Sequence, residues 1–140
     1  MFEEMGLREA KELLQQQTLG HLACVVEGEP YVVPTNYLYD GECLFFHSLP
    51  GRKINALRKN PRCCLQVAEI ENEYNWRSVI AFGNFQEITD EAERNRILRA
   101  LFQRFPHLTP VESRLTRGIE EAIVFCLHAE RITGVGERWK

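Results

Sequence analysis

Four polar residues that could bind an anion follow an apolar, strand-like run: His47, Ser48, Arg52 and Lys53. The Pro50-Gly51 break ends the run and places the arginine and the lysine at the start of a short helical pattern. A hydroxyl, a guanidinium, an ammonium and the free amides of a helix N-terminus are groups that bind phosphate. The pattern is therefore typical of a phosphate site, although a solvated helix start explains the Arg-Lys pair equally well.

The run belongs to a predicted pair of strands, 31–39 and 42–48, on either side of Asp40-Gly41. This dipeptide is typical of a tight hairpin turn in which both residues have positive φ. Pro34 cannot donate a ladder hydrogen bond, so we expect its strand at a sheet edge or bulged, with backbone groups free for a ligand. Asn36 and Tyr37 follow it, and they could border a planar ligand or simply take part in strand pairing.

The remaining chain supplies the elements that must position these residues. Apolar spacing predicts helices at 7–14, 52–59 and 91–105, the last one capped by Asp90. Strand patterns cover 19–26, 31–39, 42–48, 62–68, 76–88 and 122–132, with Gly83 as a possible bulge. Strands joined by hairpins favour an antiparallel sheet, so we predict a mainly β (α+β) fold, a small six-stranded barrel with flanking helices. The long loop 105–118, with two prolines, is of a length that is often functional.

Composition limits the classes of protein to which the chain can belong. With 140 residues, 44% hydrophobic and 26% charged, it is most simply one domain, 1–140. A net charge of −3 argues against a nucleic-acid binder, and the apolar runs are too short for a membrane span. The acidic N-terminus has no apolar signal core, so we expect a cytoplasmic location. The five cysteines, without a C-x-x-C motif, predict reduced, packed thiols, and the four histidines show no metal-ligand spacing.

Four stretches together resemble the FMN-binding split-barrel superfamily, which includes the pyridoxamine 5′-phosphate oxidases. The likeness is greatest to its shorter, nitroimidazole-resistance-like branch, and it runs from about Leu13 to Gly134. The stretches are L-G-H-L-A-C-V-V (19–26), V-P-T-N-Y-L-Y-D-G-E-C-L-F-F-H-S (33–48), G-R-K-I-N-A-L-R-K-N-P-R-C-C-L (51–65) and W-R-S-V-I-A-F-G-N (76–84). The resemblance implies a six-stranded split barrel that forms a homodimer and binds FMN at the subunit interface.

The resemblance also assigns roles to individual residues of this chain. Arg52 and Lys53 would hold the FMN phosphate, assisted by the two residues that end the third strand, His47 and Ser48. The second strand would run beside the isoalloxazine ring and place four residues near it: Pro34, Thr35, Asn36 and Tyr37. Ser78, on the fifth strand, would be the polar residue that the partner subunit often presents. No catalytic residue is identified.

A homodimer is also expected from the residues themselves, because the strands carry more large apolar side chains than one small barrel requires. The aromatic residues on which this expectation rests are Tyr37, Tyr39, Phe45, Phe82 and Phe85.

The chain departs from the true oxidases at two points. Ser78 stands where they carry a glutamine, and the sequence after its last strand lacks their arginine- and histidine-containing substrate segment. We therefore expect no oxidation of pyridoxamine 5′-phosphate. The expected function is an FMN-dependent oxidoreductase that passes electrons to a small organic acceptor, such as a nitro compound or a quinone. The alternatives are a deazaflavin in the same barrel, or a non-enzymatic flavin- or haem-binding module that recruits His47 or His128.

Overall fold

The computed structural model describes residues 1–105 and 122–139, so most of the long loop 105–118 lies outside the described residues. The helices are α1 (Leu7–Gln16), α2 (Arg52–Lys59) and α3 (Glu91–Arg104). The strands are β1 (Phe2–Glu4), β2 (Leu19–Val26), β3 (Glu29–Asn36), β4 (Leu38–Tyr39), β5 (Cys43–Ser48), β6 (Arg62–Asn72), β7 (Asn75–Glu87) and β8 (Ile123–Glu137). Every described pair of neighbouring strands is antiparallel.

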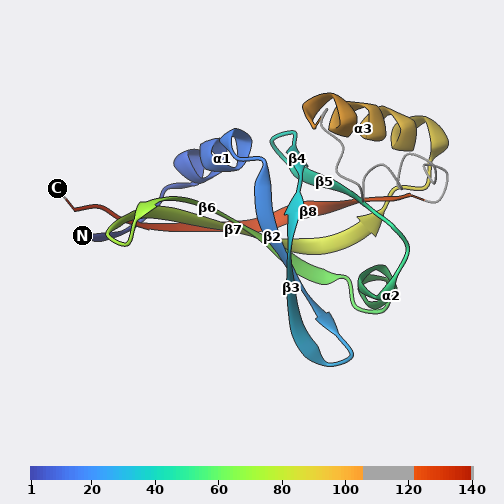
Figure 1. Ribbon diagram of the computed structural model, residues 1–140, viewed down its shortest axis with the longest axis horizontal. Coiled ribbons are helices and arrows are strands. Elements are labelled where there is room, and N and C mark those ends of the chain that lie inside the picture. Colours follow the sequence, from blue (N-terminus) through green and yellow to red (C-terminus); the bar gives the residue numbers. More distant parts are fainter. Residues whose placement is uncertain (106–121, 140) are drawn as a thin grey trace.

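The strands form one curled sheet in the order β3-β2-β6-β7-β8-β5-β4, with β1 added on β8 (Figure 1). β3 and β4 lie at opposite ends of this order, yet only Tyr37 separates them in the chain. The polypeptide therefore passes from one end of the sheet to the other at this residue. The fold is the α+β split barrel that the sequence predicts, and the edge position expected for the strand of Pro34 is confirmed.

The number of strands was predicted wrongly: the described part of the chain has eight strands, not six. One predicted strand, 31–39, is divided into β3 and β4, because its two halves pair with different neighbours, β2 and β5. The other addition is β1, whose three exposed residues show no apolar pattern and are ordered by pairing with β8.

The tight hairpin with two positive φ values lies elsewhere than predicted. It joins β2 to β3, where Glu27 has φ 52° and Gly28 has φ 81°. At the β4–β5 turn only Gly41 has positive φ, at 103°, and Asp40 pairs with Cys43 across the turn. The Asp40 carboxylate accepts hydrogen bonds from the backbone N–H groups of the two residues that follow the glycine, so it stabilises the turn as an acceptor.

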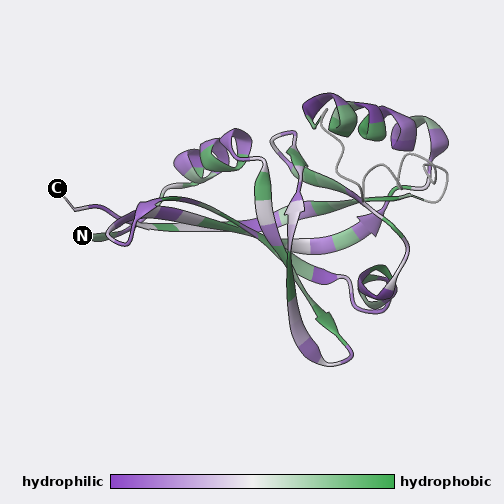
Figure 2. Cartoon of the chain, in the orientation of Figure 1, coloured by the Kyte–Doolittle hydropathy of each residue, from purple (hydrophilic) through white to green (hydrophobic). Residues whose placement is uncertain are grey.

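The helices cover two separate parts of the sheet, and each combines hydrophobic and hydrophilic residues (Figure 2). α1 buries Ala10, Leu13 and Leu14, and α2 buries Ile54 and Leu57, against the main core inside the curled sheet. α3 covers a second, smaller cluster on β5 and β8. The Asp90 carboxylate accepts a hydrogen bond from the N–H of Glu93 at 3.0 Å, which confirms the predicted cap of α3. No described helix is long and apolar enough to cross a membrane.

A bulge between β7 and β8 lies at the predicted glycine. Phe82 is opposite Arg131 and Gly83 is opposite Ala129, so Glu130 is the extra residue and lies on the partner strand. A Cβ atom on Gly83 would lie 2.1 Å from the carbonyl oxygen of His128. Only glycine allows this approach of the two backbones without a shift.

Candidate functional site

The start of α2 carries the predicted phosphate-binding residues. Gly51, in an extended conformation with φ 169°, is the N-cap residue of the helix, and it has no side chain with which to cap the first turn. α3 differs, because its first turn is capped by Asp90. The first amides of a helix have no intrahelical acceptor, so the start of α2 offers N–H donors and a positive dipole end to an anion.

The two cations at this helix start have different surroundings. Arg52 is exposed, and its Nη2 atom lies 3.0 Å from Oε2 of Glu27, in the β2–β3 turn. Lys53 is half-buried; burial lowers its pKa, and the nearby Cys24 thiol acts in the opposite direction. A phosphate on Arg52 would therefore take the place of a carboxylate, whereas Lys53 would gain a counter-charge in a partly desolvated position.

His47 and Ser48 point to opposite faces of β5, because neighbouring residues of a strand alternate. Ser48 shares its face with Phe46, whose side chain belongs to the main core with those of α2. Its hydroxyl donates to the carbonyl oxygen of Leu49 at 3.0 Å. The ring of His47 lies instead against Phe102 of α3, with 5.6 Å between ring centroids. Of this pair, Ser48 is on the side of the helix that carries Arg52 and Lys53.

The residues predicted to lie beside a flavin ring are divided between the two faces of β3. Pro34 and Asn36 are exposed on the outer face, opposite His21 and Leu19 of β2. Thr35 is half-buried on the inner face, and its hydroxyl donates to the carbonyl oxygen of Asn36 at 3.1 Å.

Ser78 lies on the same outer face of the sheet, on β7. Its hydroxyl accepts a hydrogen bond from Nε2 of Gln66 at 3.0 Å, and Gln66 lies opposite His21 in the β2–β6 ladder. The sheet register thus connects Pro34, His21, Gln66 and Ser78 across four strands. Sequence reasoning missed Gln66 and His21. The signal was present in the alternation of the strands, since Gln66 lies between the core residues Leu65 and Val67, and His21 precedes the core residue Leu22.

Tyr37 occupies a different place from the one predicted for its side chain. It is 1% exposed, and its hydroxyl donates to the carbonyl oxygen of Leu14, in the last turn of α1, at 2.6 Å. Burial raises the pKa of this phenol. The Tyr37 ring belongs to the core of its own chain, so only the backbone of Tyr37 could lie beside a ligand.

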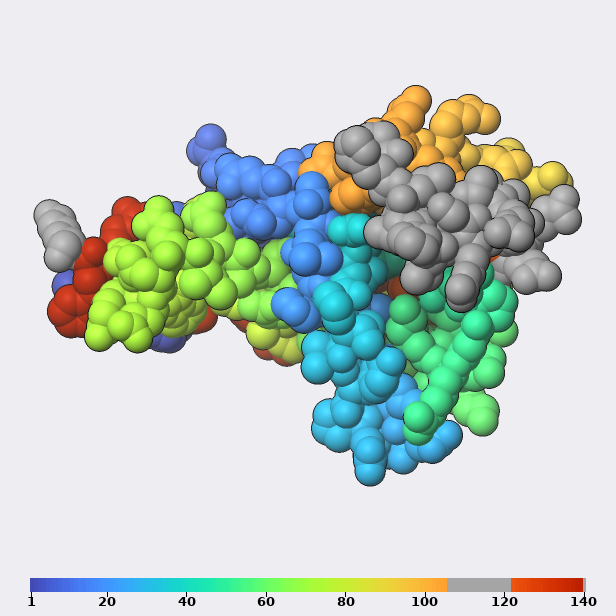
Figure 3. Space-filling view, viewed as in Figure 1, coloured from blue at the N-terminus to red at the C-terminus, as the bar shows by residue number. Residues whose placement is uncertain are grey.

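A groove of about 680 Å³ lies between α2 and the β2–β3 turn, next to Arg52. Figure 3 shows the two segments side by side, the hairpin in blue and residues 48–60 in green. We call it the α2 groove, and the residues that line it are Val25, Val26, Glu27, Gly28, Gly51, Arg52, Asn55, Ala56, Lys59 and Asn60.

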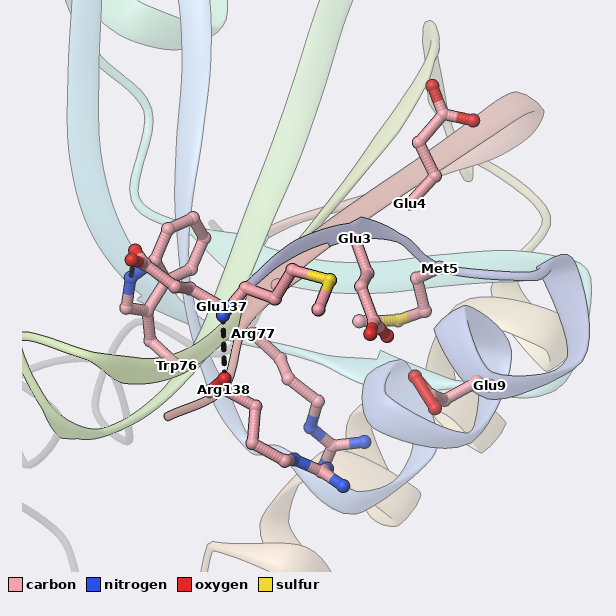
Figure 4. Close-up of a pocket in the computed structure, with 10 residues that line it drawn as sticks. Glu3, Glu4, Met5, Glu9, Trp76, Arg77, Glu137 and Arg138 are labelled. Atoms are coloured by element: carbon pink, nitrogen blue, oxygen red, sulfur yellow. Dashed lines mark hydrogen bonds between the residues drawn. The ribbon is translucent and has the colours of Figure 1, made fainter. Parts of the chain in front are cut away.

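A second hollow lies where the two ends of the chain meet (Figure 4). The N-terminal amine of Met1 donates to the carbonyl oxygen of Arg138 at 2.7 Å, and Arg77 pairs with Glu69 at 2.9 Å. Its volume of about 110 Å³ is below the range of pockets that hold ligands of flavin size. None of the predicted site residues lines it.

All five cysteines are free thiols, as predicted, and three of them are buried. Burial raises the pKa of Cys63 to about 12 and that of Cys126 to about 11. Cys43 lies 3.2 Å from Nδ1 of His128, at the edge of the second core cluster. In the described ranges, no group of three or more His, Cys, Asp or Glu residues could hold a metal ion.

Comparison with known proteins identifies the family of this chain. A family model described as pyridoxamine 5′-phosphate oxidase matches residues 7–135. An uncharacterised protein from Rhizobium meliloti (strain 1021) is 32% identical over 139 residues, which covers 93% of this chain and 91% of the relative.

Two solved structures have the same fold. A FAD-binding protein from Mesorhizobium loti aligns with a TM-score of 0.81 and 26% identity over 99% of each chain. A protein from Bacteroides thetaiotaomicron, provisionally named a 5-nitroimidazole antibiotic resistance protein, aligns with a TM-score of 0.77 and 19% identity, over 97% of this chain and 87% of the other. The family resemblance expected from the sequence is confirmed, and the chain belongs to the pyridoxamine 5′-phosphate oxidase family of flavin-binding split barrels.

Proposed function

We propose that this protein is a flavin-dependent oxidoreductase that holds the 5′-phosphate of the flavin at the start of α2. One observation carries the proposal: in a chain of a flavin-binding family, Arg52 and Lys53 begin a helix whose first turn has no side-chain cap. The FAD-binding relative with 26% identity supports a flavin as the ligand. This phosphate site requires only the riboflavin 5′-phosphate group, which FMN and FAD both contain.

The groups that would hold the phosphate are the Arg52 guanidinium, the Lys53 ammonium, the Ser48 hydroxyl and the amides of the first turn. An arginine–phosphate pair is charge-assisted and often bidentate, so Arg52 is expected to contribute most of the binding free energy. Lys53, partly desolvated, adds a point charge beside it. Bound flavin supplies the redox chemistry, and the chain supplies position and a polar environment.

We also propose that the protein is a homodimer whose interface includes the outer face of β2, β3, β6 and β7. The expectation from aromatic residues needs correction, because Tyr37, Tyr39 and Phe45 are buried in the chain's own core. Other residues support the interface instead: Val32 is 62% exposed and Leu19 is 54% exposed on this face. A monomer would leave this apolar surface in water. Pro34, Asn36 and Ser78 lie on the same face, so a second subunit placed there would enclose them.

Reduction of the bound flavin, followed by transfer to an added acceptor, tests the proposed activity. The flavin-loaded protein is reduced anaerobically and mixed with a nitroimidazole or a quinone, and we expect reoxidation faster than with oxygen alone. Pyridoxamine 5′-phosphate is expected to remain unoxidised, since Ser78 replaces the glutamine of the true oxidases. Turnover of pyridoxamine 5′-phosphate without acceptor reduction would overturn the proposal.

A pair of arginine variants tests the binding site. Arg52→Ala is expected to weaken FMN binding about a hundredfold, because a charge-assisted bidentate contact is lost. Arg58→Ala is the matched control: the residue lies on the same helix but pairs with Glu87 at 2.8 Å. Equal losses of FMN affinity in the two variants would show that the phosphate does not bind at the start of α2.

A further inference from the structure

We infer that Cys43, Cys126 and His128 form a redox site in which a small hydroperoxide, such as hydrogen peroxide, oxidises the two thiols to a disulfide. The three residues lie on one face of two neighbouring strands, since Cys43 is opposite His128 and Cys126 is two residues before it. α3 covers this side of β5 and β8 (Figure 1). Cys43 begins β5, whereas the start of α2 follows the other end of that strand, so the redox site is separate from the proposed phosphate site.

The Cys43 thiol has a base and a second thiol as neighbours. Its Sγ atom lies 3.2 Å from Nδ1 of His128, and it also forms a hydrogen bond with the Cys126 thiol. In the tautomer with the proton on Nε2, Nδ1 accepts the S–H hydrogen bond and can take the proton. Cys43 is half-buried and His128 is exposed, whereas Cys126 is buried. A molecule as small as hydrogen peroxide can therefore reach the Cys43 sulfur.

The surroundings of Cys43 make the imidazole necessary for its reactivity. Burial raises the pKa of Cys43, and the carboxylates of Asp40 and Glu42 raise it further. The thiolate is therefore scarce at neutral pH, although it is the form that attacks a peroxide. A base in contact with the S–H group overcomes this obstacle, because it accepts the proton as the sulfur attacks.

The hydrogen bond between the two thiols decides which of them reacts first. Burial raises the pKa of Cys126 to about 11, and the hydrogen bond to Cys43 contributes to this increase. On Cys43 the same hydrogen bond acts against the increase from burial and lowers the pKa. Cys43 is thus the thiol that attacks the peroxide, and Cys126 is the thiol that reacts with the product.

The reaction balances with peroxide as the oxidant. The Cys43 sulfur forms an S–O bond as the O–O bond of the peroxide breaks, and one water leaves with the proton that His128 accepted. The product is a sulfenic acid, which condenses with a neighbouring thiol. The Cys126 sulfur then forms the S–S bond, the S–O bond breaks, and a second water leaves with the Cys126 proton. The two thiols have lost two electrons and two protons, and the peroxide has become two waters.

Peptide mass spectrometry of the full-length protein tests this site. The protein is reduced, freed of the reductant and treated with an equimolar amount of hydrogen peroxide. We expect a single disulfide, between Cys43 and Cys126, as the main product. Cys24 and Cys63 are the internal control, because they lie opposite each other in the β2–β6 ladder but are both buried. They are expected to remain thiols.

Three variants test the separate roles, and circular dichroism checks that each is folded. In Cys126→Ala the oxidised Cys43 has no second thiol, so we expect its sulfenic acid to accumulate and to be trapped by dimedone. His128→Gln keeps a hydrogen-bond acceptor but cannot take a proton near neutral pH, so oxidation of Cys43 should be about tenfold slower or more. Glu130→Gln is the matched control. Glu130 is also exposed on β8, but it pairs with Arg62, and its variant should be oxidised at the wild-type rate.

Three results would overturn the inference. The first is a disulfide between other cysteines, or oxidation spread over all five. The second is an unchanged rate in His128→Gln, because Cys43 would then react without the base. The third is Cys126→Ala without sulfenic acid at Cys43, because Cys43 would then not be the thiol that attacks. Flavin takes no part in these measurements, so each of these results would leave the proposed function standing.

Discussion

Arg52 and Glu27 form an ion pair of 3.0 Å between the start of α2 and the β2–β3 turn. The two residues are 25 positions apart, and the pair forms because the hairpin returns to the side of the helix. The guanidinium that the family would use for a phosphate is therefore already in contact with a carboxylate. If the flavin phosphate binds Arg52 as proposed, it must replace this carboxylate.

The exchange predicts that removal of the Glu27 charge strengthens flavin binding. Glu27→Gln leaves Arg52 without a competing carboxylate, and we expect affinity for FMN to rise roughly two- to fivefold, the range set by an exposed ion pair. Raising the salt concentration should reduce the difference, because screening weakens the competing pair. Glu12→Gln, which removes the partner of Arg8 on α1, is the control. Unchanged affinity of the Glu27 variant at low salt would show that the pair does not compete with the ligand.

Tyr37 is predicted to act on stability and not on the flavin. Tyr37→Phe removes the 2.6 Å hydrogen bond to Leu14 and leaves a buried carbonyl oxygen without its donor. The expected loss is about 1–3 kcal/mol of unfolding free energy. Urea denaturation measures this loss, and a parallel titration should show unchanged FMN affinity. A large loss of FMN affinity with an unchanged free energy of unfolding would show that the Tyr37 hydroxyl contacts the ligand.

The extent to which the sequence predicts this molecule depends on whether a feature is local. The bounds of α2 follow from the Pro50-Gly51 break and from Asn60-Pro61, and both signals lie within a few residues of the helix ends. The division of 31–39 into β3 and β4 depends on which strands lie beside each half, and that is a property of the whole sheet.

The candidate site shows the same difference between local and non-local features. The sequence places Ser48, Arg52 and Lys53 together, because a strand end, a short turn and a helix start follow one another. It does not show Glu27 beside Arg52, nor Gln66 beside Ser78, since these contacts join separate elements. Tyr37 is expected from the sequence to border a ligand or to take part in strand pairing, but its side chain is buried and its hydroxyl donates to the Leu14 carbonyl oxygen inside the core.

The bulge at Gly83 predicts a strong effect of a single methyl group. In Gly83→Ala the new Cβ would lie 2.1 Å from the His128 carbonyl oxygen, so the β7–β8 backbone must shift. We expect a loss of about 3 kcal/mol of unfolding free energy. Gly6→Ala is the control, because a Cβ there would have no atom within 4 Å. Similar melting temperatures for the two variants would contradict the close approach of the strands.

The buried thiols predict a loss of stability at alkaline pH. Burial raises the pKa of Cys63 from 9.0 to about 12 and that of Cys126 from 9.0 to about 11. The folded state thus holds these protons more tightly than the unfolded state. The stabilisation is complete below pH 9 and is lost as the pH rises toward the folded-state values, at no more than about 1.4 kcal/mol per pH unit for each thiol.

Denaturation curves between pH 7.5 and 10.5 check this dependence. Cys63→Ala is expected to flatten the alkaline decline. Val67→Ala, which also removes a buried side chain from β6, should destabilise the protein equally at every pH. An equally steep decline in the cysteine variant would assign the titration to other groups.

The proposed dimer predicts that one charge on the outer face separates the subunits and weakens flavin binding. Val32 is 62% exposed on β3. It lies opposite Ala23 of β2, which in turn lies opposite Cys64 of β6, so the position is within the proposed interface. Val32→Glu would bury an unpaired carboxylate between the subunits, a cost that few interfaces tolerate. We expect the wild-type protein to scatter light as a dimer and the variant as a monomer, with flavin affinity reduced at least tenfold. Leu7→Glu places the same charge at a 58% exposed position on α1 and should leave both properties unchanged. A wild-type monomer that binds flavin fully would refute the dimer and the link between assembly and ligand.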